Sequence, residues 1–318
     1  NSASVAAADI STIAGDTSGT VTVSNNINLT GTAAEITTAV GDVDTFSGTP
    51  TATLSNAHTL AQLKTINNAV DGTLTLNDVT VALVGSAADI KAALAGTFAA
   101  AYTGNVTITD ADGTGIAAAD ISTIAGDTSG TVTVSTNINL TGTSAAIATA
   151  VGDVNTFSGT PTATLGDAHT LAQLKTINDA ISGTITLNSS SVALSGTSAQ
   201  VAGALNGLSN YSGTITLSDA ATVTQMTTID SAINTSPSYS LNDTSGNISG
   251  ASSALLNGAT NITATDDGVG GNTFEFDTLT STANTGTVTV TGGTDVDVVE
   301  LSTALSQSGK AAIDLSAA

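Results

Sequence analysis

Two loops of this chain carry the residue types that bind divalent cations. Asp110 and Asp112 lie in the string TDADGTG, and Asp266 and Asp267 lie in TDDGVGGN. Each loop is expected to follow a β-strand directly, and clustered carboxylates beside permissive glycines make the oxygen-rich turn that suits Ca²⁺. The spacing is not that of an EF-hand, and the terminal Glu of that motif is missing. Both loops are therefore candidate calcium sites, with ordinary polar turns as the alternative.

Catalysis has few candidate residues. His58 and His169 occupy equivalent positions just before equivalent predicted helices, which favours turn or cap residues over a general base or a metal pair. The chain has no Cys. It also shows no Ser-centred nucleophile elbow and no phosphate-binding Gly loop followed by Lys. We therefore expect no catalytic residues and no enzyme activity.

Outward-facing threonine pairs recur along the predicted strands. On one regular sheet such pairs would stack into a flat lattice that could bind ice or pack on an identical sheet. The high β-propensity of Thr on solvent-facing strands is the alternative explanation. A glycan-binding surface is also conceivable, although Tyr102, Tyr211 and Tyr239 are the only tyrosines that could stack on sugars. The pairs are Thr20/Thr22, Thr73/Thr75, Thr131/Thr133, Thr184/Thr186, Thr214/Thr216 and Thr287/Thr289.

The composition is acidic and poor in aromatic residues. The chain has 26 Asp and Glu against 4 Lys and Arg, a formal net charge of -22, and its aromatic content is 3%. So much negative charge disfavours nucleic acids and anionic membrane surfaces as partners. No run of about 18 apolar residues exists, so no membrane insertion is expected. The apolar residues are mostly Ala, Val, Leu and Ile, which favours a thin, repeated core over one large core built on rings.

An internal repeat organises the chain. The segment from Asp9 to Ser24 recurs residue for residue from Asp120 to Ser135, an offset of 111 positions, and the two histidines keep the same offset. Within each repeat, Gly followed by Thr or Asn and alternating β-branched or Leu residues predicts a strand. Short and long spacings between these strands alternate. The pattern indicates an array of small structural units.

Short helices are predicted between the strands. In 59–70, the apolar residues Leu60, Leu63, Ile66 and Val70 recur at spacings of three and four, which places them on one helical face. Ser or Thr followed three residues later by Glu, Gln or Asp is a capping pattern that satisfies free N–H groups at a helix start. This pattern occurs at Thr32/Glu35, Thr59/Gln62, Ser86/Asp89, Thr170/Gln173, Thr197/Gln200 and Thr222/Gln225.

These elements predict an α/β repeat fold, a right-handed solenoid of strand–helix coils with a parallel β-sheet along one side. A strand, a helix and a return to a strand in register gives parallel pairing. Residues 1–235 are expected to form the regular coils, with about two pairs of coils in each 111-residue repeat. The pattern then loosens, and residues 236–318 are expected to be degenerate coils or a capping or assembly region. Pro50 and Pro161 fall inside strands predicted at 49–54 and 160–165.

The strings TLAQLKTIN, GTITL and LTGTAAEI carry a resemblance to known proteins. They resemble the repeats of very large, acidic, secreted cell-surface proteins of marine bacteria, especially cyanobacteria, including proteins linked to surface motility and adhesion. The resemblance covers roughly residues 5–235. It implies an exported, non-catalytic building block that is often associated with calcium. The calcium-binding repeat Gly-Gly-x-Gly-x-Asp and a secretion signal are not present in the chain.

The sequence as a whole predicts a non-enzymatic extracellular structural repeat protein. We expect a self-assembling segment of a surface filament, layer or adhesin stalk, located outside the cell or at the cell surface. The expected partners are copies of the chain itself, joined end to end or laterally, and Ca²⁺ is the one cofactor to consider. The alternative is a binding module that uses the outward Thr ladder for ice or a surface for glycans.

Overall fold

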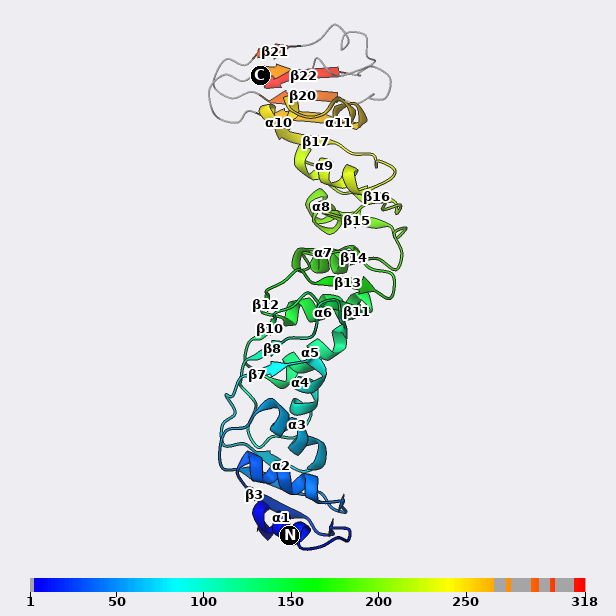
Figure 1. The fold of residues 1–318 in the computed structure, drawn as a ribbon. Coiled ribbons are helices and arrows are strands. Elements are labelled where there is room, and N and C mark those ends of the chain that lie inside the picture. The colour runs from blue at the N-terminus through cyan, green and yellow to red at the C-terminus, as the bar shows by residue number, and fades with distance from the viewer. Residues whose placement is uncertain (1–2, 266–272, 276–286, 292–297, 301–311, 318) are drawn as a thin grey trace. The chain divides into compact units, whose positions relative to one another are not determined.

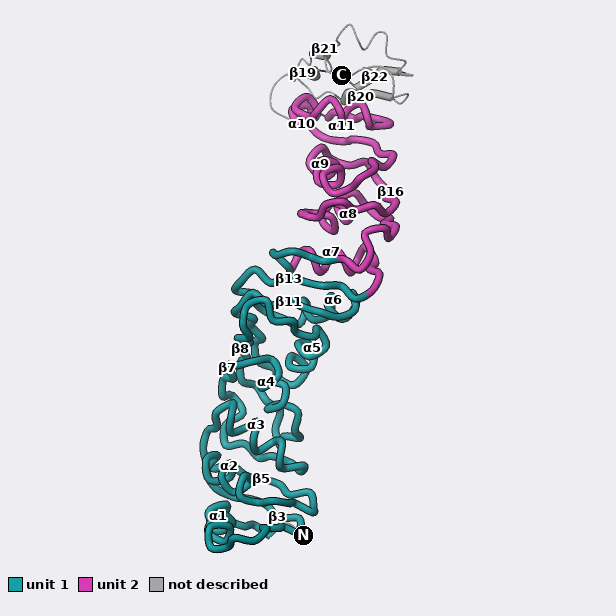
Figure 2. Tube along the Cα trace, turned by 45° about the vertical axis from the view of Figure 1, so that its right-hand side comes forward, with its two compact units in different colours: residues 1–166, 181–186 teal, residues 167–180, 187–318 magenta. Residues whose placement is uncertain are grey.

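The computed structural model describes residues 3–265, 273–275, 287–291, 298–300 and 312–317. These residues belong to two compact units (Figure 2). The first unit comprises Asn1–Gly166 and Ile181–Thr186, and the second comprises Asp167–Ala180 and Leu187–Ala318. The division of the chain near residue 235 stays a prediction.

Helices and strands alternate along the first unit (Figure 1). Its helices are α1 (Ala7–Gly15), α2 (Ala33–Asp42), α3 (Leu60–Ala69), α4 (Ala87–Leu94), α5 (Ala118–Asp127) and α6 (Ser144–Asp153). Its strands are β1 (Ala3–Ala6), β2 (Thr22–Val23), β3 (Ile27–Gly31), β4 (Thr45–Phe46), β5 (Thr51–Leu54), β6 (Leu74–Thr75), β7 (Leu83–Gly85), β8 (Val106–Ile108), β9 (Gly115–Ala117), β10 (Val132–Val134), β11 (Asn139–Gly142), β12 (Thr156–Phe157), β13 (Thr162–Leu165) and β14 (Ile185–Thr186). We call one helix together with the strand directly before it a module.

The strands of the first unit pair in parallel in several sheets. One sheet has the order β1-β3-β5-β6, in which Leu29 on β3 lies opposite Val5 on β1 and Ala52 on β5. Two further sheets have the orders β12-β10-β8-β7 and β14-β13-β11-β9, and β2 pairs with β4. At α1, α2, α5 and α6, the strand before the helix and the strand after it belong to different sheets. The chain therefore passes from one sheet to another as it advances.

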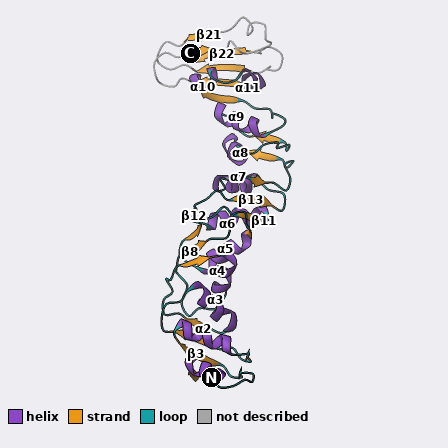
Figure 3. Cartoon of the chain, in the orientation of Figure 1, coloured by secondary structure: helices purple, strands orange, loops and turns teal. Residues whose placement is uncertain are grey.

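The second unit continues the alternation of helices and parallel strands (Figure 3). Its helices are α7 (Leu171–Ala180), α8 (Ser198–Leu205), α9 (Val223–Ala232), α10 (Ser245–Ser249) and α11 (Ser253–Gly258). Its strands are β15 (Leu194–Gly196), β16 (Ile215–Leu217), β17 (Leu241–Thr244), β18 (Ile262–Thr265), β19 (Thr273–Glu275), β20 (Thr287–Thr291), β21 (Val298–Glu300) and β22 (Ala312–Ala317). The sheets are β15-β16, β17-β18-β20-β22 and β19-β21.

The predicted caps begin the helices as expected. The side chain of Thr59 accepts a hydrogen bond from the backbone N–H of Gln62 at 3.3 Å, and the side chain of Gln62 accepts one from the Thr59 N–H at 2.9 Å. The same reciprocal pair joins Thr170 and Gln173. Because these bonds satisfy N–H groups that have no partner inside the helix, they define where each short helix starts. The predicted caps at Thr32, Ser86, Thr197 and Thr222 are confirmed as well.

Apolar side chains from helices and strands form the core within each unit. On α3, Leu63 and Ile66 are fully buried and Leu60 is half-buried, and Val70, directly after the helix, is nearly fully buried. Helices related by the repeat have matching bounds: α2 and α6, α3 and α7, and α4 and α8 each differ by 111 positions. The predicted α/β alternation with parallel strand pairing is therefore confirmed. No helix among the described residues is long and apolar enough to cross a membrane.

Two expectations about the strands are wrong. The six threonine pairs do not share a sheet, because β2, β6, β10, β14, β16 and β20 belong to six different sheets in the described part of the chain. One continuous lattice of these pairs is therefore not formed. Pro50 and Pro161 lie just before β5 and β13, not inside them, and their carbonyls accept hydrogen bonds from Gly72 and Gly183 at 2.9 and 3.0 Å.

Candidate functional site

His58 is the first of the predicted chemical residues, and its ring is buried. It lies directly before Thr59, the N-cap of α3, and its side chain is 4% exposed. Its Nε2 lies 3.2 Å from the Oη of Tyr102. Tyr102 in turn donates to the carbonyl of Val81 at 2.6 Å. These three residues connect the loop before α3, the segment before β7 and the segment before β8.

The second unit contains the same arrangement. His169 is 2% exposed, and its Nε2 lies 3.0 Å from the Oη of Tyr211. Tyr211 donates to the carbonyl of Val192 at 2.7 Å. The two histidines are 111 positions apart, whereas the two tyrosines are 109 apart. The second repeat is therefore two residues shorter than the first between α8 and Tyr211, and the histidine–tyrosine contact is kept.

The hydrogen bonds fix the tautomer of each histidine. Because the tyrosine hydroxyl gives its proton to a carbonyl, it accepts from the imidazole, and the histidine Nε2 therefore carries the hydrogen. The other ring nitrogen, Nδ1, is buried at both sites without a hydrogen-bond partner. Burial lowers the pKa of His58 and of His169, and it raises the pKa of Tyr211 to about 12.

This geometry suits a structural role. A general base needs contact with a substrate proton, and a buried imidazole whose Nε2 donates to tyrosine offers solvent no basic atom. The prediction that both histidines are turn or cap residues agrees with their place before α3 and α7. Tyr102, Tyr211 and Tyr239 are each at most 5% exposed, so their rings are not available to stack on sugars. Sequence reasoning missed the histidine–tyrosine pairs, because their members are more than 40 residues apart.

Asp110, the first predicted calcium ligand, caps a helix of the neighbouring module. Its Oδ2 accepts a hydrogen bond from the backbone N–H of Ala87 at 2.7 Å, at the first residue of α4. A carboxylate is favoured there, since the free N–H groups and the helix dipole make the helix start electropositive. The same contact recurs elsewhere in the chain. Asn56 accepts from Ala33, Asp219 from Ser198 and Asp243 from Val223, at 2.6 to 2.9 Å.

Asp112, the second predicted ligand, is also engaged by the adjacent module. Its two carboxylate oxygens accept from the backbone N–H and the side-chain amide of Asn137, at 2.9 and 3.0 Å. In the described residues, no group of three or more His, Asp or Glu side chains is placed to hold a metal ion. Asp266 and Asp267 lie outside the described residues. Calcium binding therefore stays a prediction, and at Asp110 and Asp112 the carboxylates already have N–H partners within the fold.

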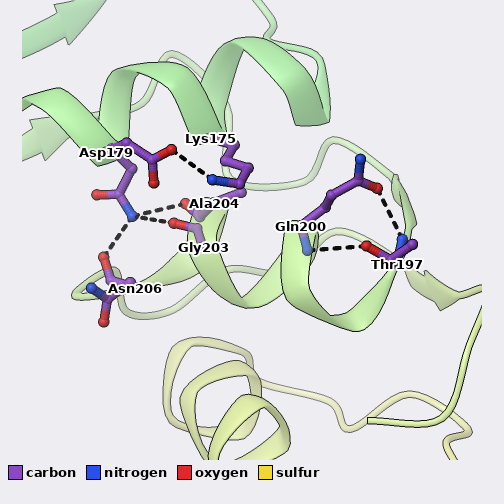
Figure 4. A network of polar contacts seen from close by, with 8 residues as sticks. Lys175, Asp179, Thr197, Gln200, Gly203, Ala204 and Asn206 are labelled. Carbon is purple, nitrogen blue, oxygen red and sulfur yellow. Dashed lines mark hydrogen bonds and ion pairs between the residues drawn. The ribbon is translucent and has the colours of Figure 1, made fainter.

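Lysines join neighbouring helices by ion pairs. Lys64 on α3 contacts Asp89 on α4 at 2.5 Å, and Lys91 on α4 contacts Asp120 on α5 at 2.5 Å. In the second unit, the residue equivalent to Asp89 is Gln200, and Lys175 instead pairs with Asp179 on its own helix at 2.6 Å (Figure 4).

Asn178 supplies the connection between α7 and α8 in this region. Its side-chain amide donates to the carbonyls of Gly203 and Asn206, both at 2.8 Å (Figure 4). In the first unit Asn67 donates to the carbonyl of Ala92 at 2.8 Å, at the equivalent place between α3 and α4. A helix-borne amide therefore connects consecutive modules in both repeats.

One open hollow lies in the first unit beside α5. It has a volume of about 360 Å³ and its lining includes Phe98, Tyr102, Asp127 and Ser129. Burial raises the pKa of the Asp127 carboxyl. Asp127 is the one carboxylate in the lining of this hollow.

Comparison with models of known protein families, with curated proteins and with solved structures finds no match to this chain.

Proposed function

We propose that the modules stack as the coils of a right-handed solenoid and that the protein is a non-enzymatic structural repeat segment. In this proposal the chain is part of an extracellular filament, layer or adhesin stalk and associates with copies of itself. One observation carries the proposal. Helices recur with an offset of 111 positions, and equivalent polar side chains connect each of them to the next helix along the chain. Structures built this way become longer by the addition of modules, because each module contacts, and is stabilised by, only the modules next to it.

Contacts between modules recur at nearly constant sequence distance. Asn26 accepts a hydrogen bond from the backbone of Thr49 at 2.9 Å, and Asn137 accepts one from Thr160 at 2.7 Å, in each case 23 residues further along the chain. The capping bonds of Asn56 and Asp110 span the same distance. A polar side chain that reaches the adjacent module, onward at Asn26 and Asn137 and backward at Asn56 and Asp110, satisfies backbone groups there, so the bonds specify stacking in register.

The charges make association between copies dependent on salt. Lys64, Lys91 and Lys175 are all engaged in ion pairs with Asp, while the chain as a whole carries a formal charge of -22. No basic patch is left in the described residues to bind a phosphate backbone. Self-repulsion of so acidic a surface falls with added salt or divalent cations, so association between copies is expected to strengthen as ionic strength rises.

The proposal is tested by solution scattering followed by electron microscopy. A compact chain of this length would have a radius of gyration of about 20 Å. A solenoid is expected to give a clearly larger radius of gyration and a scattering curve typical of an elongated, rod-like particle. Negative-stain images in salt and Ca²⁺ should then show end-to-end or side-by-side association. A radius near the compact value would overturn the solenoid, and dispersed particles under all these conditions would overturn self-assembly.

A further inference from the structure

The hollow beside α5 combines two aromatic rings with one carboxylate in a volume of about 360 Å³. The rings are those of Phe98 and Tyr102, whose centroids lie 6.0 Å apart with their planes tilted by 46°. The carboxylate belongs to Asp127, the last residue of α5. Aromatic residues make up only 3% of the chain, so two of them beside a carboxylate in one hollow are an uncommon grouping for this protein.

Backbone hydrogen bonds hold both walls of the hollow in place. The backbone on either side of Phe98 is bonded to Leu74 of β6, at 2.8 and 2.9 Å. On the opposite wall, the N–H of Ser129 donates to the carbonyl of Tyr102 at 3.1 Å. The rings and the carboxylate are therefore carried on fixed segments, and a preformed site loses little conformational entropy when a ligand binds.

The surroundings of Asp127 do not compensate its charge. Its side chain is half-buried, and among the described residues no hydrogen bond or ion pair reaches its carboxylate. Burial raises its pKa, because desolvation disfavours the charged form. It also stands at the C-terminal end of α5, where the helix dipole favours positive charge. The lysines on α3, α4 and α7 pair with other aspartates, so a cation from outside the described residues is the group that would compensate Asp127.

The second repeat keeps the fold of this region without the phenylalanine. Residues 206–210 join α8 to Tyr211, whereas the longer segment 95–101 joins α4 to Tyr102. None of the residues in the shorter segment is aromatic. The histidine–tyrosine contact is present in both repeats. The Phe98 ring is therefore not needed to form this part of the fold.

The second repeat also lacks the carboxylate. The helix after Tyr211 is α9, which ends at Ala232, and α9 has the same length as α5, which ends at Asp127. The N–H of Asn234 donates to the Tyr211 carbonyl at 3.0 Å, so the loop after α9 is held in the same way as the loop after α5. Asp127 and Phe98 are thus dispensable to the fold, and their joint presence in one hollow points to a ligand.

The lining indicates the chemical class of this ligand. Ca²⁺ takes about six to eight oxygen ligands, which one carboxylate does not approach. The hydroxyl of Tyr102 donates to Val81, and that of Thr128 donates to Gly104. Few acceptors beyond Asp127 are then left for the three N–H donors of a primary ammonium. A methylated ammonium needs no such acceptors, and both the aromatic rings and the carboxylate attract it.

We propose that this hollow binds a small compound with a quaternary or methylated ammonium group. The cation lies against the rings of Phe98 and Tyr102, and the carboxylate of Asp127 balances its charge. The net charge of -22 raises the local concentration of cations and assists binding. The inference does not depend on the stacking of modules or on self-association, because all walls of the hollow belong to the first unit.

The test is a nuclear magnetic resonance titration of the intact, isotope-labelled chain at neutral pH and physiological salt. The probe is choline, and the comparison compound is dimethylbutanol, which has the same shape with carbon in place of the charged nitrogen. Choline is expected to shift the amide signals around Phe98 and Asp127 with a dissociation constant on the order of 1 mM. The alcohol is expected to bind at least about fivefold more weakly. Signals around Tyr211 in the second unit serve as the internal control and should not move.

Two variants separate the charge from the ring. Asp127→Asn is expected to weaken choline binding about fivefold, and Phe98→Leu about threefold. Both variants are expected to fold, because the second repeat forms the same structure without either group. Asp16→Asn is the matched control, since Asp16 is the equivalent of Asp127 in the identical segment of the first repeat and is exposed. It is expected to leave choline binding unchanged.

Several results would overturn the inference. Equal binding of choline and dimethylbutanol would show an apolar hollow without recognition of charge. Tighter binding of butylammonium than of choline would contradict the assignment to a methylated cation. An affinity that Asp127→Asn leaves unchanged, or shifts spread over the whole chain, would show only the general attraction of cations to an acidic protein.

Discussion

Tyr102 holds His58 in one tautomer from a distance of 44 residues along the chain. The imidazole Nε2 lies 3.2 Å from the hydroxyl oxygen, and that hydroxyl donates to the Val81 carbonyl at 2.6 Å. Removal of the hydroxyl therefore leaves the buried Nε2–H of His58 and the partly buried carbonyl of Val81 without this partner. The contact connects three segments of the first unit through a single oxygen atom.

Tyr102→Phe is expected to lower the free energy of unfolding by about 1 to 3 kcal/mol, because the His58 N–H and the Val81 carbonyl lose their partner. Tyr239→Phe is the control, since the Tyr239 hydroxyl donates to the Leu255 carbonyl and no histidine depends on it. Urea unfolding measures both. Equal losses for the two variants would show that the histidine contributes nothing through this bond.

Acidification is expected to destabilise the protein through its two histidines. Burial lowers the pKa of His58 and of His169 below 6.5, and the nearby carboxylates of Asp78 and Asp167 only partly oppose this. The unfolded chain therefore binds these protons at a higher pH than the folded one. The stability that the neutral rings contribute is present above pH 6.5 and is lost as the pH falls below it.

The expected slope is at most about 1.4 kcal/mol per pH unit for each histidine. Denaturant unfolding at intervals between pH 8 and pH 5 measures it. The double variant His58→Gln and His169→Gln should flatten the curve in this range. A wild-type curve that is already flat between pH 7 and pH 5 would contradict the prediction.

Asp110→Ala is expected to cost about 1 to 2 kcal/mol of unfolding free energy, because the Ala87 N–H at the start of α4 loses its acceptor. Asp110→Asn keeps an acceptor oxygen and loses only the charge, so a smaller loss is expected. Asp71→Ala, at an exposed position, serves as the control.

Thermal melts of the same variants with and without Ca²⁺ test the calcium prediction, since a ligand raises the melting temperature only where its site is intact.

Ile124→Ala and Ile13→Ala form a matched pair within identical sequence. Ile124 is fully buried, so its truncation is expected to cost about 2 to 5 kcal/mol. Ile13 is largely exposed, and the same change there is expected to cost less than about 0.5 kcal/mol. Denaturant unfolding of the two variants gives the comparison. Similar losses at both positions would mean that the Ile13 side chain is covered in solution.

The local elements were predictable, because their causes lie within a few residues. Thr59 and Gln62 are three residues apart and cap α3 with each other, and the spacing of Leu63 and Ile66 already indicated the buried face. The repeat could likewise be read directly, and α3 and α7 follow it.

Contacts between modules were not predictable in the same way. Asp110 was predicted as a metal ligand, which stays a prediction, and its bond to a backbone N–H 23 residues away was not foreseen, because no pattern of side-chain types records such a partner. The threonine lattice failed for a related reason. Alternation along a strand shows which side chains share a face, but it does not show which strands share a sheet.

The regular spacing of the bonds between modules also bears on how the chain folds. Asn26, Asn56 and Asp110 each bind a residue 23 positions away, so each closure spans a short loop and costs little entropy. Proteins rich in such local contacts fold fast for their size. Folding is expected to start in any adjacent pair of modules and to spread from there. Mechanical or chemical damage to one module would then remain local and be repaired by refolding against its intact neighbours.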